Sequence, residues 1–141
     1  MTELTLTLTD MAHGGLALGR DRSGRAVFVP FAIPGETVRV RAPRPDARFA
    51  RAELLAVVRP SPDRVAPRCR HFGICGQCAF QHMTYAAQLR AKEAVVRDQL
   101  TRVGGIRNPV VRPVAPHPAA YGYRGETALF RAEGGGLGYW S

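Results

Sequence analysis

Residues 2–9 read TELTLTLT, and this stretch decides the architecture of the first part of the chain. Leu4, Leu6 and Leu8 alternate with polar residues, which is the period-two pattern of a β-strand with one buried face. Gly14 and Gly15 come shortly afterwards and provide the residue types that a tight turn needs. The chain is therefore predicted to begin with a strand and a turn.

Four more short segments have strand character, at 16–20, 26–29, 36–41 and about 50–58, and turn residues separate them. Five short strands in about 60 residues fit a small closed barrel of the OB type. We therefore expect an α+β protein: an OB-like five-stranded β-barrel over residues 1–59, followed over residues 60–141 by an incomplete small α+β domain with a cysteine-rich loop and one long helix.

The second part opens with Arg59-Pro60-Ser61-Pro62, which is typical of a linker. Thr84 is a candidate N-cap for a helix that runs to about residue 103 and ends at a glycine pair. The expected apolar face of this helix consists of Tyr85, Leu89, Val96, Leu100 and Val103. Strands are expected at 123–130 and 137–140, with a glycine turn at 134–136. The apolar run at the end of the sequence predicts a truncation.

The composition points to a nucleic-acid partner. The formal net charge is +9, with 20 Lys and Arg against 11 Asp and Glu, and such a surplus favours binding to a polyanionic partner. The alternative to a nucleic-acid partner is an ordinary protein surface on which arginine replaces lysine. The arginines expected to face outward from the barrel and bind RNA are Arg39, Arg41, Arg48 and Arg51. No stretch approaches the ~20 apolar residues of a membrane span, and the N-terminus lacks signal-peptide features, so we expect a cytoplasmic monomer.

Three cysteines predict a metal centre. Cys69, Cys75 and Cys78 have the spacing Cys-x5-Cys-x2-Cys, and in a reducing compartment such a cluster indicates metal ligation before disulfides. Gly76 is expected to allow the turn between the last two. Spacing leaves two alternatives open: a zinc site completed by His82, or an iron–sulfur cluster whose fourth ligand lies beyond Ser141. The non-ligating interpretations are a hydrogen-bonding role for His82 and an exposed loop position for His71.

Four segments of the sequence carry a resemblance to a known family. They are His13–Ala17 with Val27–Pro30 and Ile33–Glu36; Ser61–Arg64 with Pro67–Cys69, His71–Cys78 and Gln81-His82; Tyr85, Gln88, Leu89 and Lys92; and Tyr123-Arg124 with Leu137–Tyr139. Together they make the chain resemble the N-terminal part of the RNA (uracil-5-)-methyltransferase family, which makes 5-methyluridine in ribosomal and transfer RNA.

The resemblance implies a TRAM domain, an OB-like RNA-binding barrel, and a 4Fe–4S cluster on Cys69, Cys75 and Cys78. The family's fourth cysteine comes shortly after the segment where this chain ends. Gln77 stands where the family commonly has a second glycine. S-adenosylmethionine and the nucleophilic cysteine belong to a C-terminal domain that cannot be mapped here, so the chain is not expected to be active alone. Ribosomal RNA is the expected substrate.

Two other functions remain open from the sequence. One is a stand-alone RNA-binding module with a Cys3His zinc site. The other is an electron-transfer protein, which the positive charge and the incomplete cysteine set disfavour.

Overall fold

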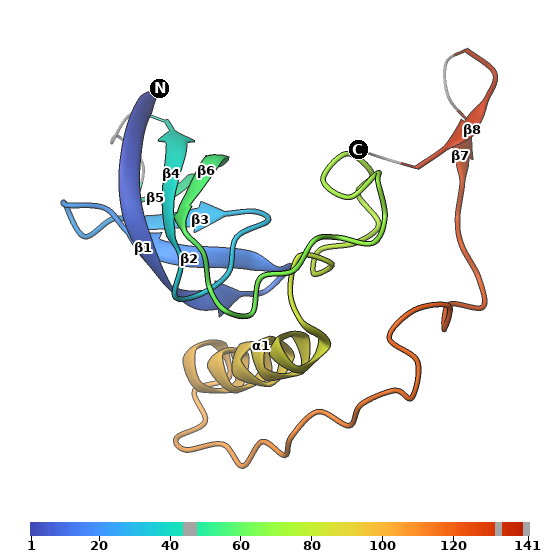
Figure 1. The fold of residues 1–141 in the computed structure, drawn as a ribbon. Helices are drawn as coiled ribbons and strands as arrows, with labels where there is room; N and C mark the ends of the chain where they lie inside the picture. Colours follow the sequence, from blue (N-terminus) through green and yellow to red (C-terminus); the bar gives the residue numbers. More distant parts are fainter. Residues whose placement is uncertain (44–47, 132–133, 140–141) are drawn as a thin grey trace.

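A computed structural model describes residues 1–43, 48–131 and 134–139 of the chain. Its largest unit is a six-stranded sheet with the strand order β5-β3-β2-β1-β4-β6, drawn in blue to green in Figure 1. The strands are β1 (Thr2–Ala12), β2 (Leu16–Arg20), β3 (Ala26–Val29), β4 (Thr37–Ala42), β5 (Phe49–Arg51) and β6 (Glu53–Arg59). The expected N-terminal β-structure is confirmed, with one strand more than predicted.

β1 lies between β2 and β4 in the sheet, and it has one buried face, as its alternating leucines predict. Leu6 and Leu8 are buried in the core of the sheet, while Thr5, Thr7 and Thr9, which alternate with them, are exposed. The first half of β1 pairs with β4, from Thr2 to Thr7, and the second half pairs with β2, from Leu8 onward. The single long strand β1 therefore joins the part of the sheet that contains β4 to the part that contains β2. The change of partner occurs at Leu8.

The predicted strand at 50–58 is divided in two, which corrects the expected count of five. Ala52 separates β5 from β6; it is 3% exposed, and its amide donates to the Phe28 carbonyl at 2.9 Å. β5 pairs in parallel with β3, whereas β6 pairs antiparallel with β4. Because β5 and β6 are neighbours in the chain but stand at opposite ends of the strand order, the sheet curls into a partial barrel.

The helix α1 (Tyr85–Asp98) packs against this barrel and continues as a π-helical segment, η1 (Gln99–Val103). Thr84 caps it as predicted, because its hydroxyl accepts from the Ala87 amide at 3.3 Å. The predicted apolar face is wrong: Val96 and Val103 are 47% and 76% exposed. The face that packs on the barrel consists of Ala87 and Ala91 with the partly buried Val95, and it contacts Met11, Ile33 and Met83. Small alanines allow the helix to approach the barrel closely.

The C-terminal part is extended. It runs from the end of the helix around the molecule to a short antiparallel ribbon formed by β7 (Phe130–Arg131) and β8 (Leu137–Gly138) (Figure 1). The strand expected at 123–130 is therefore reduced to its last residue. The predicted glycine turn does lie between the two strands, while Trp140 and Ser141 lie outside the described residues. Within the described ranges, no helix is long and apolar enough to cross a membrane.

Candidate functional site

The three cysteines lie in a closed loop, residues 65–82, whose two ends meet. Arg64 and Met83 form an isolated antiparallel bridge, and the Val65 amide donates to the His82 carbonyl at 3.0 Å. One residue further out, the Thr84 amide donates to the Asp63 carbonyl at 2.9 Å. These paired residues, 63–65 and 82–84, form what we call the neck of the cysteine loop. The neck fixes where the loop begins and ends.

Glu36 attaches the neck to the barrel. This carboxylate is 0% exposed and accepts from the Ile33 amide at 3.0 Å and the Ser61 amide at 3.2 Å. Arg64 donates to both of its oxygens, through Nε at 2.5 Å and Nη2 at 2.8 Å, and also to the Phe31 carbonyl at 2.9 Å. The segment expected to be a linker is thus held against the barrel.

The hydrogen bonds to Glu36 determine its ionisation. Burial by itself raises the pKa of this carboxyl, but the hydrogen bonds from Arg64, Ser61 and Ile33 outweigh burial and lower the pKa below the ordinary value of 4.5. Glu36 is therefore ionised at neutral pH, and its charge is matched by that of Arg64.

His82 is a second anchor of the neck. It is 1% exposed, and its Nε2 lies 3.2 Å from the Ala32 carbonyl oxygen. Burial is the main cause of the lowered pKa of His82, so the ring is neutral and Nε2 carries the donated proton. This is the hydrogen-bonding role considered for His82 from the sequence. His71, in contrast, is exposed in the loop as expected.

Within the loop, a tight turn places Cys75 beside His71. The Cys75 amide donates to the His71 carbonyl at 2.9 Å, and Gly73 takes the left-handed conformation with φ 88°. Gly76, the glycine that the sequence suggested for this role, does not have a positive φ. The glycine that the turn requires therefore lies two residues before Cys75, not between Cys75 and Cys78. The Phe72 ring of this turn packs edge-on against Phe31 of the barrel at 5.2 Å.

All three cysteines line one pocket of about 330 Å³, which we call the cysteine pocket. Its other walls come from Gln77, residues 124–127 and Tyr139. Two of these wall residues are linked directly, because Arg124 donates from Nη1 to the Gln77 side-chain oxygen at 2.8 Å. A further contact holds the C-terminal segment nearby, because Arg68 lies over the Tyr121 ring at 5.1 Å. Residues 124–127 are wall elements that sequence spacing did not identify.

The chemistry of the cysteine pocket is that of soft thiol donors beside a cation. Cys69, Cys75 and Cys78 are free thiols. Over the described residues, however, no three His, Cys, Asp or Glu side chains are grouped so that they could hold one metal ion. His82 does not line the pocket. The structure thus brings the three cysteines to one place without bringing them to the mutual distances of a single-ion site.

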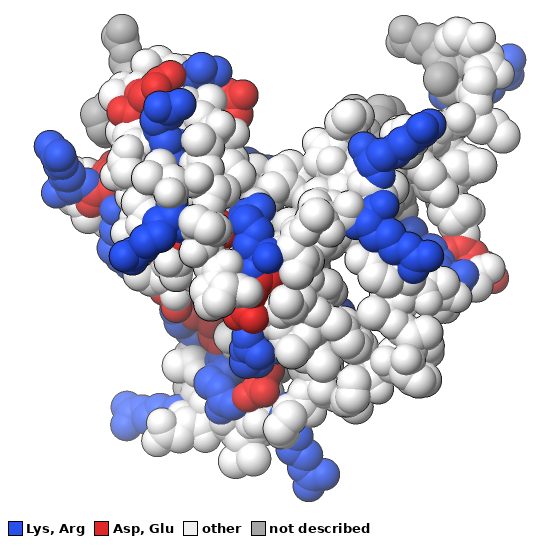
Figure 2. Space-filling view, viewed as in Figure 1, with Lys and Arg blue, Asp and Glu red and all other residues white. Residues whose placement is uncertain are grey.

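The four arginines predicted to bind RNA have different surroundings. Arg39, Arg48 and Arg51 are exposed, whereas Arg41 forms ion pairs with Glu53 at 2.9 Å and Glu3 at 3.5 Å. Arg39 lies on β4 and Arg51 on β5, which are not neighbours in the sheet. Figure 2 accordingly shows Lys and Arg side chains spread over the visible face, interspersed with Asp and Glu, and not gathered into a single patch.

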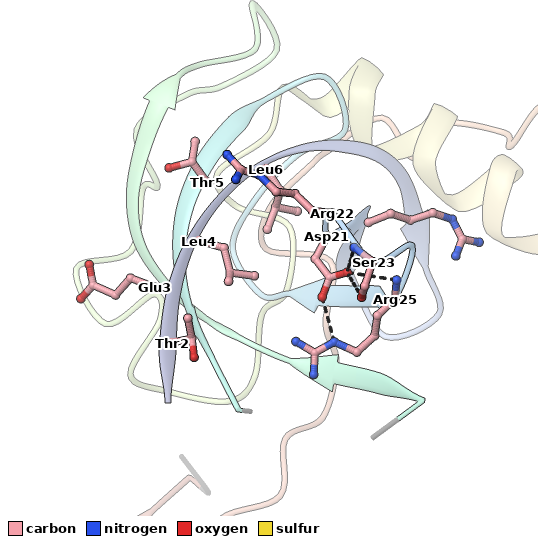
Figure 3. A pocket seen from close by; sticks show the side chains of 10 residues that line it. Thr2, Glu3, Leu4, Thr5, Leu6, Asp21, Arg22, Ser23 and Arg25 are labelled. Atoms are coloured by element: carbon pink, nitrogen blue, oxygen red, sulfur yellow. Dashed lines mark hydrogen bonds and ion pairs between the residues drawn. The ribbon is translucent and has the colours of Figure 1, made fainter. Parts of the chain in front are cut away.

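A second pocket, of about 680 Å³, lies between the first half of β1 and the turn that joins β2 to β3. We call it the β1 pocket; its lining residues are Thr2–Leu6, Arg20–Ser23 and Arg25. Figure 3 shows Leu4 and Leu6 extending from β1 toward the turn, and Glu3 pointing away. Strand alternation alone did not reveal this pocket, although turn residues were expected between the strands at 16–20 and 26–29.

Comparison with known proteins agrees with this architecture. Residues 2–55 match the TRAM domain. Over 121 residues the chain is 45% identical to an uncharacterized RNA methyltransferase of Nitratidesulfovibrio vulgaris, covering 86% of this chain and 26% of that protein. It is 42% identical over 118 residues to the 23S rRNA (uracil(1939)-C(5))-methyltransferase RlmD of Dechloromonas aromatica (82% and 27% covered). The corresponding protein of Nitrosococcus oceani is 41% identical over 107 residues (76% and 24%).

The chain spans about a quarter of the length of these curated relatives. The match to the TRAM domain covers nearly all of the barrel, and the matches to the longer proteins also extend over most of the residues C-terminal to the barrel. The chain therefore carries a TRAM domain, and over most of its length it is a homologue of the RNA methyltransferases named for uracil-C5 methylation of 23S rRNA.

Proposed function

We propose that this chain is the RNA-binding and 4Fe–4S-binding part of an S-adenosylmethionine-dependent RNA (uracil-5-)-methyltransferase, with ribosomal RNA as the substrate. The observation that carries the proposal is the cysteine pocket, which collects all three cysteines beside a barrel matched to the TRAM domain. The names of the relatives support the reaction and the substrate. The methyl donor would supply the transferred group, and no step of that transfer is assigned to residues of this chain.

We infer a cluster and not a single zinc ion because the cysteine segment resembles that of the cluster-bearing members of the family. The three cysteines line one pocket, so all three thiols are available as ligands on the same side of the loop. The Arg124 guanidinium on the opposite wall adds positive charge beside an anionic group.

The stand-alone module with a Cys3His zinc site is the weaker alternative. It requires His82 as a ligand, but the ring does not line the cysteine pocket. The Nε2 of the ring is engaged with the Ala32 carbonyl, and the buried Nδ1, which has no hydrogen-bond partner among the described residues, is the nitrogen that would have to reach the ion. We therefore do not propose His82 as the fourth ligand of the cluster, and another group must occupy that position.

In the proposed function, the neck couples RNA binding to the cluster. Glu36, Arg64 and His82 hold the two ends of the cysteine loop on the barrel. RNA bound on the barrel would therefore meet the cysteine loop at a fixed position. When bound, the cluster would cross-link Cys69 to the Cys75–Cys78 turn and so stiffen the loop.

Metal analysis tests the cluster directly. Protein purified without oxygen should be brown and contain iron and acid-labile sulfide in equal amounts. Cys75→Ser, which removes one thiolate with little change in size, should lose most of the iron. His71→Gln is the matched control, because His71 is an exposed residue of the same loop, and this variant should keep its iron. A colourless protein with one zinc per chain would contradict the cluster and favour the alternative module.

The affinity for RNA should fall as the salt concentration rises. Arg39 should contribute more to this affinity than Arg41 does. Arg39 is exposed, whereas the charge of Arg41 is shared with Glu3 and Glu53. We expect Arg39→Ser to weaken binding to all RNA sequences and to lower the slope of log affinity against log salt by about 1. Arg41→Ser should change the slope less. Fluorescence anisotropy at several salt concentrations measures both, and equal slopes for wild type and Arg39→Ser would remove Arg39 from the RNA-binding surface.

A further inference from the structure

The β1 pocket exists because β1 changes partners along its length. Up to Thr7 the strand pairs with β4, and pairing with β2 begins at Leu8. On the β2 side, residues 2–7 consequently have no strand partner among the described residues. The chain leaves β2 at Arg20 and turns away through Asp21–Arg25, so a gap remains between this turn and the first half of β1.

The gap ends at Gly19, where β2 pairs with Leu8 of β1. A Cβ at this position would overlap Leu6 Cδ1 and lie 2.8 Å from the Thr7 carbonyl oxygen. Glycine at this position therefore allows β2 to close against β1 beside Leu6. The lining of the pocket is apolar at Leu4 and Leu6, of which Leu6 is 6% exposed, and polar at the turn.

The turn that forms the opposite wall is held in place by its own hydrogen bonds. The Asp21 carboxylate accepts from the Ser23 hydroxyl at 2.6 Å, the Ser23 amide at 2.9 Å and Arg25 Nε at 2.9 Å. The Ser23 hydroxyl has the largest part in lowering the pKa of Asp21 to about 2, so the carboxylate stays ionised. The wall is thus formed before any ligand arrives.

Two arginines of this wall are placed to contact an anion. Arg20 is exposed, and its Nη1 donates to the Gly24 carbonyl at 2.8 Å. Arg22 is exposed at the tip of the turn, and within the described ranges it makes no ion pair. The pocket therefore combines apolar side chains from β1 with guanidinium groups at its rim.

We propose that the β1 pocket binds a single unpaired nucleotide of RNA, with the base against Leu4 and Leu6 and the phosphate at Arg22. This inference rests on the proposed RNA-binding function and names a binding site within it. A base offers flat apolar faces and a hydrogen-bonding edge, and the unpaired edge of β1 supplies backbone donors and acceptors for that edge. The volume of about 680 Å³ lies in the usual range for small-molecule sites. A duplex is excluded because its bases are stacked and paired.

Two pairs of matched variants test the site in the whole chain. Arg22→Ser and Arg59→Ser each remove one exposed arginine, but only the first changes the pocket lining. Leu4→Ser and Leu54→Ser each remove a partly buried leucine that packs on the same barrel core, and again only the first changes the pocket. Circular dichroism and urea unfolding establish that each variant is folded.

The probe is a labelled single-stranded uridine oligonucleotide of about ten residues, within the site sizes of OB-type domains, alongside an RNA duplex of similar length. We expect Arg22→Ser and Leu4→Ser each to weaken oligonucleotide binding about fivefold, roughly the effect of losing one base or phosphate contact. Arg59→Ser and Leu54→Ser should change it less than about twofold. The affinity for the RNA duplex should not change in Leu4→Ser.

The outcomes separate this inference from the function on which it rests. If the wild-type chain binds the oligonucleotide but the two members of each pair behave alike, the β1 pocket is not a nucleotide site and RNA binding stands. If Leu4→Ser weakens duplex and single strand equally, the effect is not base binding and the inference is overturned. If the wild-type chain binds neither RNA, the proposed RNA-binding function fails together with the site.

Discussion

Replacing Arg64 with methionine is expected to lower the free energy of unfolding by about 3 kcal/mol, because it leaves a buried carboxylate without its cation. Glu36 is 0% exposed, and Arg64 donates to both of its oxygens. The Arg64 side chain is 24% exposed, which places the effect at the lower end of the range for broken buried pairs. Urea unfolding near neutral pH measures it.

A surface ion pair is the control for this prediction. Arg102 pairs with Asp98 at 2.9 Å, but the two side chains are 66% and 38% exposed. Arg102→Met should therefore cost less than about 1 kcal/mol. If the two methionine variants lost the same free energy of unfolding, Glu36 and Arg64 would not act as an anchor of the neck.

The effect of Arg64→Met should also depend on pH. Glu36 has a lowered pKa in the folded wild type, so its contribution is fully present above the ordinary value of 4.5 and is lost as the pH falls through the lower folded pKa. Without Arg64, burial raises the pKa of Glu36, and the variant takes up a proton at higher pH. The difference between wild type and variant should consequently be largest near neutral pH and narrow in acid. A difference that did not change with pH would assign the effect to lost packing of the arginine chain.

The second large effect is expected at Gly15, where alanine should lower the free energy of unfolding by about 3 kcal/mol. Gly15 has φ +80°, and a Cβ there would lie 2.8 Å from Ala79 Cβ and 3.3 Å from the Phe80 ring. The substitution therefore combines backbone strain with a collision between the barrel and the end of the cysteine loop. Urea unfolding gives the cost, and faster tryptic cleavage at Arg68 and Arg70 would show that the loop has loosened.

Gly14 separates the two causes. It has nearly the same conformation, φ +83°, but a Cβ there would meet nothing within 4 Å. Gly14→Ala should therefore show the strain alone, about 1 kcal/mol, and leave the rate of cleavage unchanged. Equal losses at the two glycines would mean that the barrel and the loop tolerate a methyl group between them.

Sequence reasoning was most successful where structure depends on neighbouring residues. The alternation in residues 2–9 predicted β1, because a strand turns successive side chains to opposite faces whatever lies beyond it. Thr84 was recognised as an N-cap for a similarly local reason, since its hydroxyl bonds to an amide three residues on. The helical face was assigned wrongly because large apolar residues were weighted over Ala87 and Ala91, which are the residues that contact the barrel.

For the candidate site, the sequence by itself determined the three thiols and the basic surplus. Tertiary structure decided the rest. It joined Arg64 to Glu36, 28 residues away, and His82 to Ala32, 50 residues away, and it set residues 124–127 opposite the cysteines. It also divided the strand predicted at about 50–58 at Ala52, and it opened the β1 pocket where one strand changes partners. Periodicity and spacing describe contacts within a few residues, whereas buried ion pairs and pockets depend on which distant segments the folded core brings together.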